Sequence, residues 1–200
     1  MTILVLDLDG VVVLGHPQGG RWDKDLMHDL GIRPELVQTR FFRPHFRRAV
    51  LGEADLFQIL DAVWPELGCV GTPREFVDYW FAKDSRVDPE VLTAVDAWRA
   101  GGGKAYLATV QEHHRARHVW EKIGLSQHFD GMQHSAALGA AKPDPEFYRR
   151  AHAKLPAAAR SDVLFLDDRL DNVEAAAAFG WTARHYREIE DLRGALAKLR

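Results

Sequence analysis

A short apolar segment that ends in two closely spaced aspartates lies almost at the N-terminus of the chain. Residues 3–6 read Ile-Leu-Val-Leu, which predicts a β-strand buried on both faces. Asp7 and Asp9 follow, and in a continuing strand their side chains would point to the same side. Two neighbouring carboxylates repel each other, so the pair indicates a bound cation, a shared proton or a ligand. Gly10 allows the backbone to turn sharply there, although Asp-Gly is also an ordinary turn dipeptide.

The composition is that of a folded globular protein of one domain, or of a domain with an inserted subdomain. The chain has 200 residues, of which 46% are hydrophobic. A net charge of −3 gives no basic surface, so nucleic acid is not the expected partner. No apolar run approaches the ~20 residues of a membrane helix, and the N-terminus lacks the pattern of a signal peptide. Cys69 is the single cysteine, which excludes an intrachain disulfide and fits a cytoplasmic protein.

The segment from residue 16 to residue 85 predicts a separate helical subdomain. It follows a glycine-rich passage at residues 15–20, which is typical of a hinge or loop. Residues 53–64 carry apolar side chains at helical spacing, and residues 72–75 have the form of a capping box with proline at the first helical position. The segment contains no convincing strand, so we expect it to be all helical.

Strands and helices are expected to alternate in the rest of the chain. We expect strands near residues 105–108, 131–134, 163–166 and 182–186, and helices that begin near residues 88, 112, 144, 173 and 189. This alternation predicts an α/β fold, in which a central parallel sheet lies between two layers of helices. The core would comprise residues 1–15 and 86–200.

Polar residues recur just after the predicted strands, where ligands bind in sheets of this kind. Thr109 follows the second strand, Lys142 lies in a loop before a helix, and Asp167 and Asp168 follow the strand at residues 163–166. Each has an ordinary interpretation when taken alone: a strand-end threonine, a solvated lysine, a helix cap. Asn172 would likewise be an ordinary helix residue. Their joint order makes these ordinary interpretations inadequate.

This ordered set closely resembles the four motifs of the haloacid dehalogenase (HAD) superfamily. The matching residues are Asp7-x-Asp9-Gly10-Val11, Thr109, Lys142-Pro143, and Asp167-Asp168 with Asn172. The resemblance covers residues 1–15 and about 88–186, and the helical segment between them looks like the cap that many members insert after the first motif. It implies a Rossmann-like, three-layer core and a phosphatase-type hydrolase that acts on a small phosphorylated metabolite.

The resemblance also implies a Mg²⁺-dependent reaction through an aspartyl-phosphate. Asp7 would be the nucleophile, and Asp9 would protonate the leaving alcohol and then deprotonate the attacking water. The carboxylates of Asp7 and Asp168 and the backbone carbonyl of Asp9 would hold the Mg²⁺ ion, which prefers oxygen ligands.

The remaining motif residues have supporting roles by the same resemblance. The Thr109 hydroxyl would donate to a phosphoryl oxygen, and Lys142 would neutralise the phosphate and the crowded carboxylates. Asp167 would hold a metal-bound water or orient Asp168, with Asn172 in the same motif. Val110 departs from the family pattern, because many members have a polar residue there, often asparagine. The departure removes a donor near the nucleophile.

Several other functions share part of this pattern. Members that cleave carbon–halogen bonds need no proton for a halide and lack an aspartate at the position of Asp9, so Asp9 argues against dehalogenation. A phosphosugar mutase shares all the motifs and stays an alternative. A receiver-type signalling domain gathers similar residues, but it places its acidic pair first and its acceptor aspartate after a middle strand. A catalytically silent binding protein is disfavoured because the motif residues are intact.

Two further groups of residues have competing interpretations. An aromatic and basic cluster lies in the helical segment: Trp22, Arg40, Phe41, Phe42, Arg43, His45 and Arg47. We favour aromatic side chains that pack inside the cap and arginines that face solvent, although Arg43 or Arg47 would suit an anionic substrate group. His113 and His114 are adjacent in a predicted helix and so do not share a face; we expect surface or rim histidines and no zinc site.

Overall fold

The computed structural model describes residues 2–68, 71–156 and 158–199, so Cys69 lies outside the described residues. Within these residues, five strands form one sheet in the spatial order β3-β2-β1-β4-β5, and every neighbouring pair is parallel. The strands are β1 (Ile3–Leu6), β2 (Lys104–Thr109), β3 (Gly131–His134), β4 (Val163–Asp167) and β5 (Thr182–His185). The predicted parallel α/β core is confirmed.

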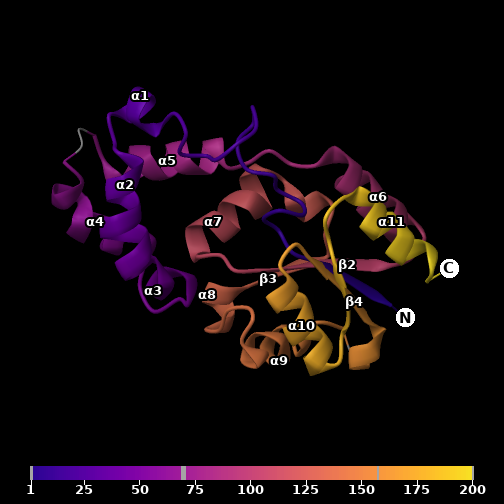
Figure 1. Ribbon diagram of the computed structural model, residues 1–200. Helices are drawn as coiled ribbons and strands as arrows, with labels where there is room; N and C mark the ends of the chain where they lie inside the picture. The colour runs from indigo at the N-terminus through magenta and orange to yellow at the C-terminus, as the bar shows by residue number, and fades with distance from the viewer. Residues whose placement is uncertain (1, 69–70, 157, 200) are drawn as a thin grey trace.

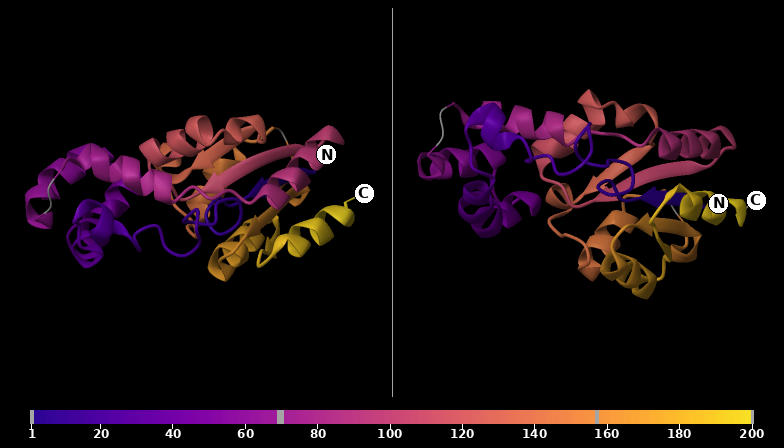
Figure 2. Two further views of the ribbon diagram at one scale, coloured as in Figure 1. Left: turned by 90° about the horizontal axis from the view of Figure 1, so that it is seen from above. Right: turned by 45° about the horizontal axis from the view of Figure 1, so that its top comes forward.

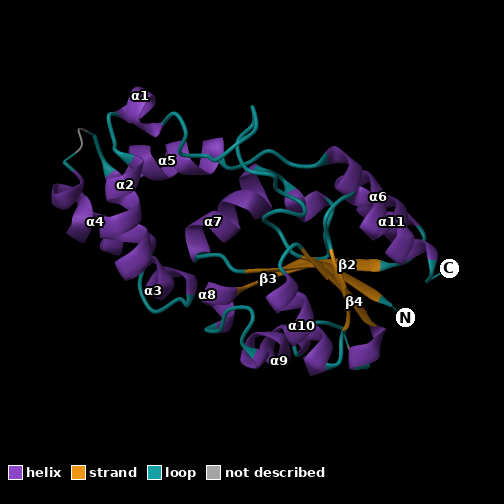
Figure 3. Cartoon of the chain, viewed as in Figure 1, coloured by secondary structure: helices purple, strands orange, loops and turns teal. Residues whose placement is uncertain are grey.

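The central strand β1 supplies side chains to two separate cores because successive residues face opposite sides of a sheet. Leu4 and Leu6 pack in one core with the helices α6 (Pro89–Ala100) and α11 (Ile189–Ala197). Ile3 and Val5 pack in the other core with α9 (Pro145–His152) and α10 (Leu170–Phe179). Figures 1 and 3 show the sheet between these two pairs of helices. All four strand side chains are buried, and each contributes about 1.5–3 kcal/mol.

The other elements of the core are short. They are α7 (His113–Arg117), the π-helical turn η2 (His118–Lys122), η3 (Leu125–Gln127), α8 (Ser135–Leu138) and η4 (Arg160–Asp162). Two of the sequence predictions need correction. The helix expected from residue 173 begins at Leu170, and α8 was not expected at all.

The predicted helical segment contains only helices among its described residues. They are α1 (Leu26–Leu30), α2 (Pro34–Val37), the π-helical η1 (Gln38–Phe46), α3 (Arg47–Val50), α4 (Leu56–Leu67) and α5 (Pro73–Lys83). Helix α4 begins three residues later than residue 53, because Asp55 caps it by accepting from the amides of Phe57 and Gln58. The predicted capping box is confirmed: Thr72 and Glu75 exchange hydrogen bonds at the start of α5.

This helical cap has a hydrophobic core of its own and lies beyond the end of the sheet, opposite to the chain termini (Figure 2). The chain passes between cap and sheet twice, and the two passages pair with each other. The Leu14 amide donates to the Arg86 carbonyl at 2.7 Å, and the Asp88 amide donates to the Val12 carbonyl at 2.9 Å. The carboxyl ends of the strands therefore face the cap. Within the described residues, no helix combines the length and the apolar character that a membrane span requires.

Candidate active site

The loop after β1 presents two carboxylates at the edge of the sheet. The amide of Asp7 still belongs to the sheet and donates to the Leu166 carbonyl at 2.9 Å. The chain then turns tightly, with the amides of Val12 and Val13 both donating to the Leu8 carbonyl at 2.8 Å. Gly10 has a φ of +81°, and a Cβ atom there would collide with the side chain of Asp168. Glycine is therefore required at this position for both conformation and space.

Asp7 is buried at the base of the site. It is 7% exposed, and its Oδ1 accepts from the Leu8 amide at 2.7 Å and lies 2.8 Å from the Lys142 Nζ. Burial raises the pKa of Asp7 to about 6, although the Lys142 ammonium opposes the rise. Both contacts involve Oδ1, so Oδ2 has no partner among the residues that the structure describes.

Lys142 connects the aspartate that follows β1 with the aspartate that ends β4. Its Nζ lies 2.8 Å from Asp7 Oδ1 and donates to Asp167 Oδ2 at 2.5 Å, and its side chain is almost fully buried. Burial alone would lower the pKa of this ammonium group, but the charges of Asp7 and Asp167 outweigh burial and raise its pKa. The lysine is therefore held as a cation between two carboxylates.

The two aspartates after β4 lie in different surroundings. Asp167 is fully buried, and both of its oxygens have partners: Asn172 Nδ2 donates to each of them, and Lys142 donates to Oδ2. Asp168 is exposed and lines a cavity together with Asp7 and Asp9. The protein on one side of its carboxyl group partly desolvates it, and this together with the charge of Asp167 raises the pKa of Asp168. Asp168 can therefore bind a ligand, whereas both oxygens of Asp167 already accept hydrogen bonds from the protein.

The cavity at this edge has a volume of about 380 Å³. It is lined by Asp7, Asp9, Gly10, Thr109, Val110, Lys142, Asp168, Arg169 and Asn172. The Thr109 side chain is buried, and its Oγ1 has no hydrogen-bond partner among the described residues. A buried hydroxyl without a partner costs about 1–3 kcal/mol, so this group fits a ligand that accepts a hydrogen bond. Val110 contributes an apolar wall to the same cavity.

Asp9 has a partner that the sequence did not reveal. Gln111 Nε2 donates to Asp9 Oδ2 at 2.5 Å. Solvent reaches Asp9 from the cavity, but the protein surrounds its carboxyl group, and this desolvation together with the charge of Asp7 raises its pKa to about 7. A carboxyl group with this pKa is suited to both donate and accept a proton near neutral pH.

A buried arginine joins α7 to the end of α5, where the chain returns from the cap. Arg115 is 1% exposed, and its guanidinium donates to the backbone carbonyls of Phe81 and Asp84 and lies 3.6 Å from Asp84 Oδ2. Burial of Asp84 raises the pKa of its carboxyl group, and the Arg115 charge opposes this. No pattern in the sequence indicates a buried Arg115, because a charged helix residue usually faces solvent.

The donor set fits a divalent cation that prefers oxygen. Carboxylate oxygens of Asp7, Asp167 and Asp168 lie within 4.8 Å of one another. With Asp9, four carboxyl groups gather at this edge of the sheet, and the cationic residues that line the cavity are Lys142 and Arg169. This excess of negative charge would repel a phosphate unless a cation were bound. The hard oxygen donors suit Mg²⁺ and not a softer metal.

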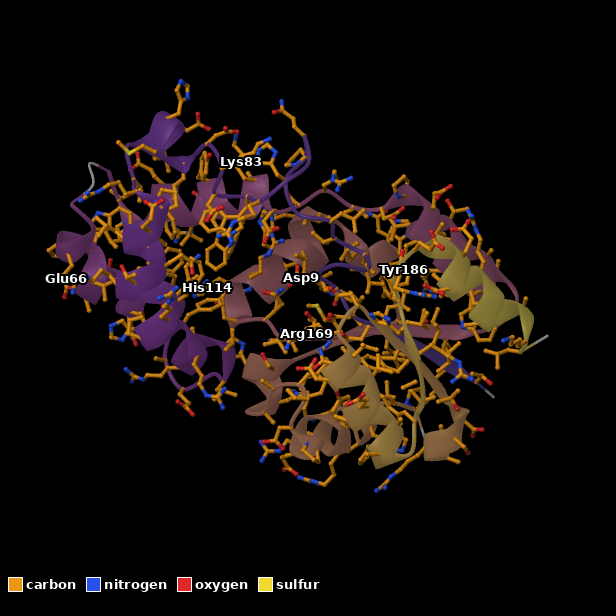
Figure 4. The ribbon with its side chains drawn as sticks, in the orientation of Figure 1. Asp9, Glu66, Lys83, His114, Arg169 and Tyr186 are labelled. Atoms are coloured by element: carbon orange, nitrogen blue, oxygen red, sulfur yellow. The ribbon has the colours of Figure 1, made fainter. Side chains whose placement is uncertain are left out.

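Arg169 and the two histidines of α7 lie near the site. In Figure 4, Asp9 and Arg169 lie close together at the centre of the molecule, with His114 between them and the cap. The two neighbouring histidines face different partners, as expected for adjacent helical residues: His114 Nε2 lies 2.7 Å from Asp55 Oδ2, and His113 Nδ1 lies 3.3 Å from His134 Nε2.

The aromatic and basic residues of the cap are divided between interior and surface. Phe41 is fully buried in the core of the cap, and Trp22 and Phe42 pack partly against the same core. Arg40, Arg43 and Arg47 are exposed. Binding of an anionic substrate group by Arg43 or Arg47 stays a prediction.

The sequence is similar to a known protein family and to a named phosphatase. The family model of the haloacid dehalogenase-like hydrolases matches residues 1–180. A sesquiterpene phosphatase from Aspergillus oryzae is 29% identical over 132 residues, which cover 62% of this chain and 65% of that protein. The match thus spans less than two thirds of the relative's length.

Solved structures share the fold at low sequence identity. A HAD family enzyme from Bacteroides thetaiotaomicron, in complex with magnesium and inorganic phosphate, superposes with a TM-score of 0.76 at 15% identity over 94% of each chain. The L-2-haloacid dehalogenase from Xanthobacter autotrophicus superposes with a TM-score of 0.66 at 17% identity, over 99% of this chain and 83% of that chain. At these identities the likeness concerns the fold.

Proposed function

Because the chain belongs to the haloacid dehalogenase-like hydrolase family, we propose that it is a Mg²⁺-dependent phosphatase that cleaves a small phosphorylated metabolite. The observation that carries this proposal is the convergence of Asp7, Asp9, Thr109, Lys142 and Asp168 on one cavity. Two similar proteins support it: a relative that is a phosphatase by name, and a structural neighbour that binds magnesium and inorganic phosphate.

The reaction would begin with attack by a carboxylate oxygen of Asp7 on the phosphorus atom. The Leu8 amide donates to Oδ1 and the Lys142 ammonium lies beside the same oxygen, and these contacts hold the carboxylate in position for the attack. The new bond to phosphorus forms as the bond to the leaving alcohol breaks, and Asp9 gives its proton to the departing oxygen. Thr109 donates to a phosphoryl oxygen and so satisfies its buried hydroxyl.

Hydrolysis of the aspartyl-phosphate would restore the enzyme. Asp9, now ionised, takes a proton from a water molecule whose oxygen attacks the phosphorus, and the bond to Asp7 breaks. Inorganic phosphate leaves, and Asp9 is again protonated. The pKa of about 7 for Asp9 suits this exchange of roles.

Mg²⁺ would be held by the carboxylates of Asp7 and Asp168 and by the backbone carbonyl of Asp9. When bound, it would offset the repulsion between the acidic site and the phosphate dianion. Lys142 holds Asp7 in place on the other side. Asp167, whose oxygens are occupied by Lys142 and Asn172, would position this lysine.

The presence of Asp9 favours phosphoryl transfer over dehalogenation, although dehalogenases share the fold. An alkoxide leaving group needs a proton, whereas a halide does not. In this structure Asp9 lines the cavity, where it can reach a substrate, and Gln111 donates a hydrogen bond to its carboxyl group. Both features suit a proton donor.

The proposal is tested by release of phosphate from p-nitrophenyl phosphate. We expect Mg²⁺-dependent release that EDTA abolishes and that Asp7→Asn lowers by roughly 10³-fold or more. Asp61→Asn, which changes an exposed aspartate in the cap, is the matched control and should leave the rate unchanged. Activity that persists in EDTA, or in Asp7→Asn, would overturn the proposal.

A further inference from the structure

Gln111 is a buried amide that contacts Asp9 but lies outside the sequence motifs. It is 7% exposed and belongs to the short loop between β2 and α7. Its Nε2 donates to Asp9 Oδ2. The opposite orientation of the amide would bring two acceptor oxygens together whenever Asp9 is ionised, so the N–H group is the one that faces the carboxylate.

The loop that carries Gln111 is fixed on both sides. The Gln111 carbonyl accepts from Ser135 Oγ at 3.1 Å and from the Ala136 amide at 3.2 Å, which ties it to the start of α8. The next residue, Glu112, caps α7 by accepting from the amides of His114 and Arg115. These contacts hold the backbone of Gln111 in place, and its side chain extends from there to Asp9.

We propose that Gln111 is a positioning residue, which holds Oδ2 of Asp9 and so directs Oδ1 toward the oxygen of the leaving group. This inference rests on the proposed phosphatase function. The carbonyl oxygen of a protonated carboxyl group is a better acceptor than its hydroxyl oxygen, so the Gln111 N–H at Oδ2 favours the form of Asp9 with its proton on Oδ1. As the phosphorus–oxygen bond breaks, that proton passes to the leaving oxygen, and Asp9 becomes a carboxylate whose Oδ1 later accepts the proton of water.

This role also explains how the protein accommodates Val110. The family resemblance leads one to expect a polar side chain at that position, near the nucleophile. Here an apolar wall takes its place, and the amide is supplied one residue later. It acts on the second carboxylate, Asp9, and not on Asp7.

A positioning role predicts an effect that depends on the leaving group. Phenyl phosphate and p-nitrophenyl phosphate differ little in size, but phenolate is much the stronger base and so needs the proton of Asp9 more. The constant kcat/KM reports the steps up to cleavage of this bond. Gln111→Met keeps the length of the side chain and removes the donor. We expect it to lower kcat/KM for phenyl phosphate by roughly 10-fold or more, and for p-nitrophenyl phosphate by about 2-fold or less.

The ratio of the two kcat/KM values does not depend on the fraction of protein that is folded, so it separates positioning from a loss of structure. Gln133→Met, in the neighbouring strand β3, is the matched control and should leave the ratio unchanged. If Gln111→Met lowers both values by the same factor, or neither, the positioning role is wrong. If the wild-type protein hydrolyses neither ester with Mg²⁺, the proposed function itself fails.

Discussion

Lys142 is the residue on which the charge balance of the site depends. Its ammonium group lies within 2.8 Å of Asp7 and 2.5 Å of Asp167, with almost no exposure to solvent. Removal of one partner from a buried charged cluster leaves the others without compensation, which costs about 3–5 kcal/mol. Lys142 therefore contributes to folding, besides the role in phosphate binding that we propose for it.

We expect Lys142→Met to lower the melting temperature in EDTA by roughly 6–12 °C, because about 3 kcal/mol or more is lost in a chain of 200 residues. Added Mg²⁺ should restore part of this loss, since it supplies positive charge to the same carboxylates. Differential scanning calorimetry measures both effects. Lys154→Met, at an exposed lysine, is the control. A variant as stable as the wild type would show that Lys142 does not balance these charges.

The histidine pair beside the site gives a prediction for the dependence of stability on pH. Burial, and then the charge of nearby His113, lower the pKa of His134 from 6.5 to about 4. Between these values the unfolded chain binds more protons at this position than the folded chain. Stability should therefore fall as the pH decreases from about 6.5 to about 4.

The contribution of His134 is isolated by comparison with His134→Gln. Urea denaturation at pH 7.5 and pH 4.5 measures the free energy of unfolding of both proteins. Between these two pH values the wild type should lose about 1–2 kcal/mol more of this free energy than the variant. This is less than the full pKa shift of His134 implies, because the ring is partly solvated. A difference in unfolding free energy that stays constant with pH would contradict this assignment.

At the level of single residues, the sequence predicted which side chains would meet but not every side chain that holds them. Asp7, Thr109 and Asp167 directly end or follow strands, and the carboxyl ends of parallel strands share one edge. Gln111 lies in a loop with no periodic pattern, and its direction depends on contacts with residues 135 and 136. No local signal in the sequence encodes those contacts.

Among the structural elements, α7 connects the loop that carries Gln111 with the end of α5, where the chain returns from the cap. Its Arg115 reaches across to the carbonyls of Phe81 and Asp84. We expect Arg115→Met to lower the free energy of unfolding by about 3 kcal/mol, since it leaves buried acceptors without partners. Urea denaturation measures this value.

Arg117, in the same helix but exposed, provides the control for Arg115. Arg117→Met should change the free energy of unfolding by about 0.5 kcal/mol or less. If the two variants were equally stable, the buried guanidinium would not be an important connection between α7 and the end of α5.

Elements with a strong apolar pattern were predicted well, and elements without one were not. Helix α10 begins three residues before the expected point because its first residue, Leu170, is 57% exposed and shows no core-facing periodicity. Helix α8 has only four residues, too few for a periodic signal. The strands β1 and β4 carry continuous apolar runs, and they were located almost to the residue.

At the scale of the whole molecule, the sheet order explains why residues far apart in sequence form one site. Strand β1 lies at the centre, between β2 and β4, so Asp7, which follows β1, is a neighbour of Thr109 and Asp167 at the ends of β2 and β4. The loop with Lys142 joins them from the segment between α8 and α9. The cap lies beyond this edge of the sheet, on the side opposite to the termini (Figure 2).

The central claim is that Asp7 accepts a phosphoryl group that Asp9 then helps water to remove. The most direct measurement uses Asp9→Asn with p-nitrophenyl phosphate and Mg²⁺, followed by acid quenching and mass spectrometry of peptides. Asparagine cannot take a proton from water, whereas nitrophenolate leaves without one, so phosphoenzyme should accumulate. The account predicts a burst of nitrophenolate stoichiometric with enzyme and a phosphoryl group on the peptide that contains Asp7. A burst that leaves this peptide unmodified, or that labels another residue, would contradict it.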